Sequence, residues 1–263
     1  MKPIQTIPPG QLKNIRFLLT DIDDTMTSGG LLPSTSLSAV ERLDQVGIGV
    51  IPITGRPAGW CDHIARMWPV KGVVGENGAF YFSYDRNKHQ MHQFFSKDEQ
   101  QRKSDRLQLN QIKNRVLKEV PGTGIASDQN YRIADLAIDY CEDVAPLSEV
   151  EIRRIARIFE MSGATVSISS IHVNGWFGSY NKLTMTRTCL GDLFNIDLER
   201  DNEMIAYIGD SPNDEPMFSF FTNSVGVANV SDFELAAQPK WITENRSAEG
   251  FAEFTELLLQ SKK

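Results

Sequence analysis

RFLLTDIDDTMT, residues 16–27, is a short apolar run that ends in three carboxylates within four positions. The apolar run predicts a buried strand. Asp21, Asp23 and Asp24 repel one another, so holding them together costs free energy unless a cation or a proton compensates. The alternative is a solvated turn that closes the strand, because aspartate is a common turn residue. The choice depends on which other residues the fold brings to the same place.

Composition narrows the class of protein. The 263 residues are 41% hydrophobic and 23% charged, which is typical of a globular chain with one large domain or two modest ones. A net charge of -7 and a pI near 5.2 argue against a nucleic-acid-binding protein, which would carry a basic stripe. No apolar window has the length of a membrane span, and the first ten residues lack the apolar centre of a signal peptide. The prolines among these ten residues predict a loose leader. Three separated cysteines fit no metal spacing and are expected to be reduced thiols of a cytoplasmic protein: Cys61, Cys141 and Cys189.

Strand and helix patterns alternate after the acidic turn. Ser38 and Glu41 form a capping-box pattern, which predicts a helix that starts near Ser38. Residues 48–53 form a second apolar run that ends at Thr54, and Pro57 is well placed to open the next helix. This alternation predicts an α/β fold with a doubly wound, Rossmann-like parallel sheet, in which ligands bind at the carboxyl ends of the strands.

The pattern of apolar and charged residues changes in the middle of the chain. Residues 80–95 are typical of a hairpin, and residues 96–177 combine a highly charged helix with short strands and a second helix that begins at Ser148 with Glu151 as its capping partner. We therefore predict a core of residues 1–95 and 178–263 with an α+β cap domain, residues 96–177, inserted between the two parts.

A second acidic strand end follows the insertion. The apolar run 204–208 ends in Gly-Asp-Ser-Pro-Asn-Asp, which contains Asp210 and Asp214. The tips of parallel strands can share one rim, so the two groups of carboxylates are expected to meet. Oxygen ligands without histidine favour a hard cation, and Mg²⁺ beside a phosphate is the commonest case. Thr54 and Gly55, at a third strand end, are suited to hydrogen-bonding phosphate oxygens.

Four segments in this order resemble the motifs of the haloacid dehalogenase-like (HAD) hydrolases. The size and place of the insertion resemble the branch with a type II, subtype B cap, which includes Cof-type and sucrose-phosphatase-like sugar phosphatases. The segment Glu76-Asn77-Gly78-Ala79 also resembles a segment of that branch. The four motif segments are Asp21-Ile22-Asp23-Asp24-Thr25, Thr54-Gly55-Arg56, Lys182 and Gly209-Asp210-Ser211-Pro212-Asn213-Asp214.

The resemblance implies catalytic roles for four residues. Asp21 would attack phosphorus and form an aspartyl phosphate. Asp23 would protonate the leaving alcohol and then activate the water that hydrolyses this intermediate. Thr54 and Lys182 would hold the phosphoryl oxygens and neutralise developing charge.

The resemblance also implies a metal site and substrate contacts. Asp21, the backbone carbonyl of Asp23 and Asp210 would bind Mg²⁺, and Asp214 would bind or orient it. Asn213 would orient the phosphate or a neighbouring ligand. We assign substrate binding to Gly55, Arg56, Asn77 and Asn213.

Several residues keep alternative interpretations. Asp24 replaces the glycine that is usual after the second aspartate, and we expect its side chain to face solvent. Arg56 could contact substrate or brace its loop by ion pairing. Trp176 could equally face a sugar or pack at the hinge, whereas hinge packing is expected for Phe177.

Three functions are compatible with these residues. The first is a Mg²⁺-dependent phosphomonoesterase that acts on a small phosphorylated metabolite, most simply a sugar phosphate. The second is a phosphomutase of the phosphomannomutase type, which would return the phosphoryl group to the substrate. The third, more distant, is a non-catalytic module that accepts phosphate on Asp21. No nucleic acid or membrane partner is expected, and the sequence leaves the oligomeric state open.

Overall fold

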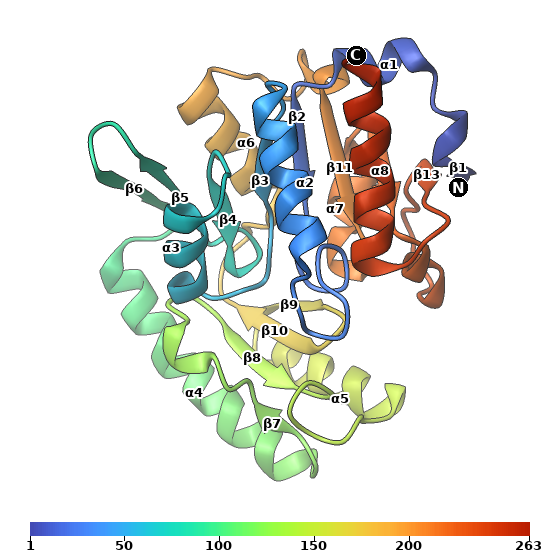
Figure 1. Cartoon of the computed structure of the whole chain (residues 1–263). Coiled ribbons are helices and arrows are strands. Elements are labelled where there is room, and N and C mark those ends of the chain that lie inside the picture. The colour runs from blue at the N-terminus through green and yellow to red at the C-terminus, as the bar shows by residue number, and fades with distance from the viewer.

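The core is built on one parallel sheet. A computed structural model describes residues 1–263, and its six-stranded sheet has the order β1-β13-β12-β11-β2-β3 (Figure 1). Every neighbouring pair in this sheet is parallel. The predicted α/β fold with a parallel core sheet is therefore confirmed. The strands are β1 (Lys2–Pro3), β2 (Phe17–Thr20), β3 (Gly49–Pro52), β11 (Ile205–Gly209), β12 (Asn223–Gly226) and β13 (Trp241–Ile242).

Helices cover both faces of this sheet, as the double-sided burial of its strands requires. One face packs against α1 (Pro9–Asn14), α2 (Ser34–Gln45), α3 (Ala58–Met67) and α8 (Ser247–Ser261), and the other against α6 (Lys182–Phe194) and α7 (Glu215–Phe220). Alternate residues of β2 belong to the two apolar clusters, with Leu18 in the first and Leu19 in the second. The apolar runs of the sequence reflect this burial on both faces.

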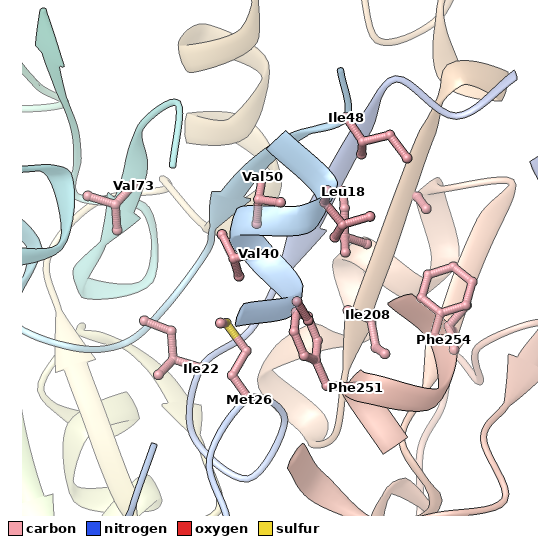
Figure 2. Close-up of a cluster of buried hydrophobic side chains, with 14 of the residues drawn as sticks. Leu18, Ile22, Met26, Val40, Ile48, Val50, Val73, Ile208, Phe251 and Phe254 are labelled. Atoms are coloured by element: carbon pink, nitrogen blue, oxygen red, sulfur yellow. The ribbon is translucent and has the colours of Figure 1, made fainter. Parts of the chain in front are cut away.

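The first cluster joins segments that are far apart in the chain. Figure 2 shows Leu18 of β2, Val40 of α2, Val50 of β3 and Phe251 of α8 converging on one apolar centre. Each of these side chains is fully buried. Burying one such side chain stabilises the fold by about 1.5–3 kcal/mol. The cluster therefore holds the strands of the sheet, and with them their carboxyl ends, in fixed positions.

Two local expectations were wrong. The helix α2 begins at Ser34, directly after Pro33, and not near Ser38; its first turn is held by Ser36, whose hydroxyl donates to the carbonyl of Met26 at 2.8 Å. The first residues are no loose leader, because β1 extends the core sheet beside β13 and Ile4 is buried in the first cluster. Burial of this residue, together with the parallel pairing, holds the segment against the sheet despite its prolines.

A hairpin extends the core beside β3. The strand β4 (Val73–Gly75) pairs with β5 (Phe80–Asp85), and β5 pairs with β6 (Gln90–Phe95), both antiparallel. A single parallel bridge between Ile53 and Val74 connects this small sheet to the end of β3. The predicted hairpin over residues 80–95 is confirmed.

The middle of the chain forms a separate four-stranded antiparallel sheet of order β7-β8-β10-β9. Helices α4 (Glu99–Glu119) and α5 (Glu149–Met161) pack against it around their own apolar cluster (Figure 1). This sheet and its helices are the inserted cap, and their boundaries at residues 95/96 and 177/178 stay a prediction. The strands are β7 (Gly124–Ile125), β8 (Leu136–Asp139), β9 (Thr165–Ile168) and β10 (His172–Trp176).

Capping boxes start both cap helices. The expected box at Ser148 and Glu151 is present, with the Ser148 backbone N–H donating to the Glu151 carboxylate at 2.8 Å. A second box, which the sequence reading missed, joins Asp98 and Gln101 at the start of α4. No helix is both long and apolar enough to cross a bilayer.

A buried carboxylate ties the cap to the core. Glu76, in the 3-10 turn after β4, is fully buried and accepts backbone N–H groups of Ala58 in the core and of Ile133, Ala134 and Asp135 in the cap, at 2.7–3.2 Å. Because residues 133–135 give their backbone N–H groups to Glu76, β8 begins only at Leu136.

Candidate active site

The three acidic or hydroxyl-bearing strand ends lie side by side, because β11, β2 and β3 are neighbours in the sheet. In register, Thr20 of β2 lies opposite Ile208 of β11 and Pro52 of β3. Asp21, Thr54 and Asp210 follow these residues by one or two positions, and all three are buried. The structure thus brings together the residues that the sequence placed at one rim.

Lys182 is the cation that pairs with the carboxylates at this rim. It is the first residue of α6, and its Nζ donates to Oδ1 of Asp21 at 2.7 Å and to Oδ1 of Asp214 at 2.6 Å. Burial acts to lower the pKa of Lys182, but the two carboxylates outweigh burial and raise that pKa above its usual value. Lys182 therefore stays a cation with only 2% of its side chain exposed.

Burial and neighbouring carboxylates oppose the ionisation of Asp21. Burial, followed by repulsion from Asp214 and Asp23, raises the pKa of Asp21 to about 8 against the attraction of Lys182. Burial and then Asp21 likewise raise the pKa of Asp210 well above its usual range. One lysine does not neutralise three buried carboxylates, so the site favours a further cation.

The donor set fits a hard cation. One oxygen each of Asp21, Asp210 and Asp214 lies within 4.8 Å of the others, and no histidine or cysteine belongs to the group. Asp210 receives only long hydrogen bonds, from the Thr25 hydroxyl at 3.2 Å and the Asn229 amide at 3.5 Å. Asp21 and Asp210 therefore retain oxygen lone pairs for a metal ion.

Asp214 differs from those two carboxylates, because both of its oxygens already accept hydrogen bonds. Oδ1 accepts from Lys182 and, at 2.5 Å, from the hydroxyl of Tyr207, and Oδ2 accepts from the backbone N–H groups of Asp210 (2.9 Å) and Ser211 (3.3 Å). These contacts orient Lys182 and the loop after β11, and they leave Asp214 less capacity than Asp21 and Asp210 to bind a metal directly. The expected role of Asp214 in binding or orienting the metal stays a prediction.

The guanidinium of Arg56 forms ion pairs with carboxylates, chiefly with Asp23. Its Nε lies 3.0 and 2.9 Å from the two oxygens of Asp23, and its Nη2 donates to Asp23 at 2.7 Å and to Glu142 of the cap at 3.0 Å. Its Nη1 lies 3.4 Å from Asp128, also in the cap, and its guanidinium covers the ring of Trp60. Arg56 is 5% exposed and makes the ion pairs that were one of the two roles expected for it, while a contact with substrate stays a prediction.

Thr54 and Gly55 serve the same loop. The Thr54 hydroxyl accepts the backbone N–H of Arg56 at 3.0 Å, and the Gly55 carbonyl accepts an N–H of the cap residue Arg132 at 2.8 Å. A side chain at Gly55 would meet the amide of Asn77 at 3.3 Å. Thr54 and Gly55 therefore help to hold the loop that carries Arg56, and Gly55 allows a close approach of the backbone to Asn77.

Asn77 is the one predicted substrate-binding side chain without a protein partner. Its side-chain nitrogen and oxygen are both buried and make no hydrogen bond, although the residue is only 3% exposed. Its backbone has φ 54°, a left-handed conformation that asparagine tolerates better than most residues. Unpartnered buried amide groups cost about 1–3 kcal/mol, so this amide is suited to a bound ligand.

Two cavities and a small enclosed space surround the rim. A cavity of about 460 Å³ is lined by Asn77, Lys182, Asn213 and the cap residue Trp176. The enclosed space is lined by Asp21 and Asp23 from the core, by Asn213, and by the cap residues His172 and Asn174 among others. A second cavity, of about 570 Å³, is lined by Asp23, Arg56 and the aromatic residues Trp60, Trp68 and Tyr131.

The structure also places the residues that had alternative interpretations, which are Trp176, Phe177 and Asp24. Trp176 lines the first cavity, whereas Phe177 packs against the cap cluster, as expected. Asp24 is partly buried, and the expectation that its side chain faces solvent stays a prediction. Its φ of 53° is the left-handed conformation that glycine adopts most easily. Its carbonyl accepts the amide of Asn229 at 3.0 Å.

The sequence reading missed several residues of the site. Tyr207 was hidden inside an apolar strand, and Glu142 and Asp128 lie in cap loops whose position depends on the docking of the cap. The adjacent His172, 2.8 Å away, and then Arg56 lower the pKa of Glu142 to about 2, so this carboxylate is ionised near neutral pH. Only the acidic character of the cap loops could have signalled these contacts.

Comparisons with known proteins agree with this geometry. Residues 18–135 and 180–254 match the haloacid dehalogenase-like hydrolase family. A phosphoglycolate phosphatase of Methanobrevibacter smithii is 25% identical over 257 residues, which cover 92% of this chain and 98% of that protein. A protein of Thermoplasma acidophilum has the same fold with a TM-score of 0.67 and 18% identity, over 92% of this chain and 99% of the other. A putative HAD/COF-like hydrolase of Plasmodium vivax gives a TM-score of 0.66 and 19% identity, over 96% and 97% of the two chains. The chain therefore belongs to the haloacid dehalogenase-like hydrolase family and is an enzyme of its phosphatase type.

Proposed function

We propose that the enzyme is a Mg²⁺-dependent phosphomonoesterase that hydrolyses a small sugar phosphate through an aspartyl-phosphate intermediate. The observation that carries the proposal is the bridge that Lys182 makes between Asp21 and Asp214, beside Asp210, at the carboxyl edge of the sheet. A lysine held there is suited to neutralise a phosphoryl group that reacts at Asp21.

The chemistry divides into two displacements. An oxygen of Asp21 attacks phosphorus, the bond from phosphorus to the ester oxygen breaks, and Asp23 gives its proton to the departing alcohol. Asp23, now a carboxylate, takes a proton from water, whose oxygen attacks the phosphorus of the intermediate. The bond between phosphorus and Asp21 then breaks and releases inorganic phosphate, so that both carboxyl groups return to their first state.

Asp21, Asp210 and the backbone carbonyl of Asp23 would hold Mg²⁺, which supplies neutralisation of phosphoryl charge when it is bound. Thr54 and Lys182 would hold phosphoryl oxygens. Asp214 keeps Lys182 in place through its Oδ1, as its filled hydrogen-bonding capacity indicates.

Sugar phosphates are favoured by the chemistry of the lining. Hydroxyl and amide groups of Asn77, Thr165, Ser167 and Asn213 line the first cavity, with Trp176 as an apolar wall. Arg56 and Arg132, the arginines that line the enclosed space, are already paired with carboxylates. Neither is therefore available to bind a second negative group on the substrate. We therefore expect a neutral, hydroxyl-rich leaving group and weaker activity on phosphoglycolate, the substrate named for the archaeal relative.

The protein is proposed to work in the cytoplasm. Its three cysteines are free thiols, two of them buried, which suits a reducing compartment.

A substrate panel tests this function. Purified enzyme with Mg²⁺ is expected to release phosphate from sugar phosphates and from p-nitrophenyl phosphate, and to lose this activity with EDTA. Asp21→Asn is expected to abolish release. Retained activity in that variant, or no release from any ester, contradicts the proposal, and an isomerised sugar phosphate in place of free phosphate identifies a mutase.

A further inference from the structure

Arg56 connects the proposed acid–base residue to the cap. Three carboxylates surround its guanidinium: Asp23 from the core, and Asp128 and Glu142 from the cap. The side chain of Arg56 is 6% exposed, while those of Asp23 and Glu142 are 18% and 27% exposed. The charge network is therefore largely desolvated, and its geometry depends on where the cap sits.

The pairing with Asp23 is at odds with the role proposed for that residue. Asp23 receives three of the contacts of Arg56, in a bidentate arrangement that uses both carboxylate oxygens. To protonate a leaving alcohol, Asp23 must turn at least one oxygen toward the substrate. A buried arginine that loses its partner is strongly destabilising unless another acceptor takes its place.

The cap provides those acceptors. Glu142 already accepts from Nη2 of Arg56, the same nitrogen that donates to Asp23, and Asp128 lies beside Nη1. Another cap residue, Arg132, pairs with Asp128 at 2.9 Å and donates to the Gly55 carbonyl at 2.8 Å. The loop that carries Arg56 is thus held to the cap on both its backbone and its side chain.

On the basis of the proposed function, we propose that Glu142 and Asp128 are positioning residues that act through Arg56 on Asp23. They share the guanidinium with Asp23, so Arg56 holds Asp23 without binding it alone, and one oxygen of Asp23 can turn toward the leaving oxygen while Arg56 keeps its cap partners. Without Glu142, Arg56 binds Asp23 more tightly and holds its carboxyl group away from the substrate.

The test compares two leaving groups in Glu142→Gln, a substitution of the same shape. An alkyl ester such as a hexose 6-phosphate needs a proton on its departing oxygen, whereas p-nitrophenolate leaves without one. The constant to measure is kcat/KM, because it includes steps only up to departure of the leaving group and omits hydrolysis of the intermediate. The ratio of the two kcat/KM values does not depend on how much of the preparation is folded, so partial unfolding does not obscure the result.

We expect Glu142→Gln to lower kcat/KM for the alkyl ester about 10-fold, a part of the 10²–10⁴-fold that general acid catalysis contributes, and to leave that for p-nitrophenyl phosphate within about twofold. Arg56→Lys should lower the same ratio, because lysine keeps the charge but cannot bridge three carboxylates. The control is Glu149→Gln, which removes an exposed cap carboxylate paired with Arg153 and should change neither constant.

An equal fall for both esters, or no fall for either, overturns the inference while leaving the phosphomonoesterase function in place. A wild-type enzyme that hydrolyses neither ester contradicts the function itself, and the inference with it.

Discussion

Removing the hydroxyl group of Tyr207 should show how much its hydrogen bond to Asp214, the partner of Lys182, contributes to stability. Tyr207 is fully buried on β11, and its hydroxyl donates to Oδ1 of Asp214 at 2.5 Å. Burial, followed by Asp214, raises the pKa of Tyr207 well above its usual range, so the phenol is neutral and remains the donor. Tyr207→Phe keeps the ring and deletes only this bond.

The cost follows from what Asp214 retains. Its Oδ1 keeps the bond from Lys182, and its Oδ2 keeps both backbone N–H groups, so no oxygen is left without a partner. The loss is that of one hydrogen bond to a charged group, about 1.5–3 kcal/mol. Because Lys182 stays in place, kcat/KM should fall only several-fold.

Urea unfolding of the metal-free protein measures this free energy, with Tyr140→Phe as a matched control. The hydroxyl of Tyr140 donates to the neutral carbonyl of Ser169 at 2.6 Å, so its removal should cost about 1 kcal/mol. If Tyr207→Phe costs no more than Tyr140→Phe, the bond to Asp214 is not charge-assisted and the reasoning is refuted.

Three further predictions concern the metal, the ligand and pH. Mg²⁺ at about 100 times its dissociation constant should stabilise the wild type by about 2.7 kcal/mol, seen as a rise in Tm, and Asp210→Asn should abolish that rise. Asn77→Gly accommodates the positive φ and removes an amide without a protein partner, so it should raise KM about 10-fold with little change in Tm; a large fall in Tm would contradict the ligand role. The pKa of Glu142 is lowered from 4.5 to about 2, so its contribution to stability is present above pH 4.5 and lost as the pH falls toward 2; Glu142→Gln should flatten this part of the stability curve, and an unchanged acid limb would show that the pairing contributes nothing.

Local patterns were enough to predict most of the fold. Apolar runs bounded by acidic or glycine-containing turns marked the core strands, and the capping box at Ser148 marked the start of α5. The start of α2 was misplaced, because a serine and a glutamate three residues apart also occur inside a helix and the preceding Pro33 was the stronger signal. The docking of the first residues was missed, because it depends on pairing with β13, 239 positions further on (Lys2 with Trp241).

The sequence by itself determined the rim where Asp21, Thr54 and Asp210 meet. Parallel strands in a doubly wound order carry their carboxyl ends to one edge, so chain order alone places such residues together. Only the tertiary structure decided what each side chain contacts there: that Asp214 is saturated by Lys182, Tyr207 and backbone N–H groups, and that Arg56 is occupied by carboxylates. The physical reason is that these partners come from a strand interior and from cap loops. Their approach depends on the packing of the cap against the core, which no local pattern in the sequence encodes.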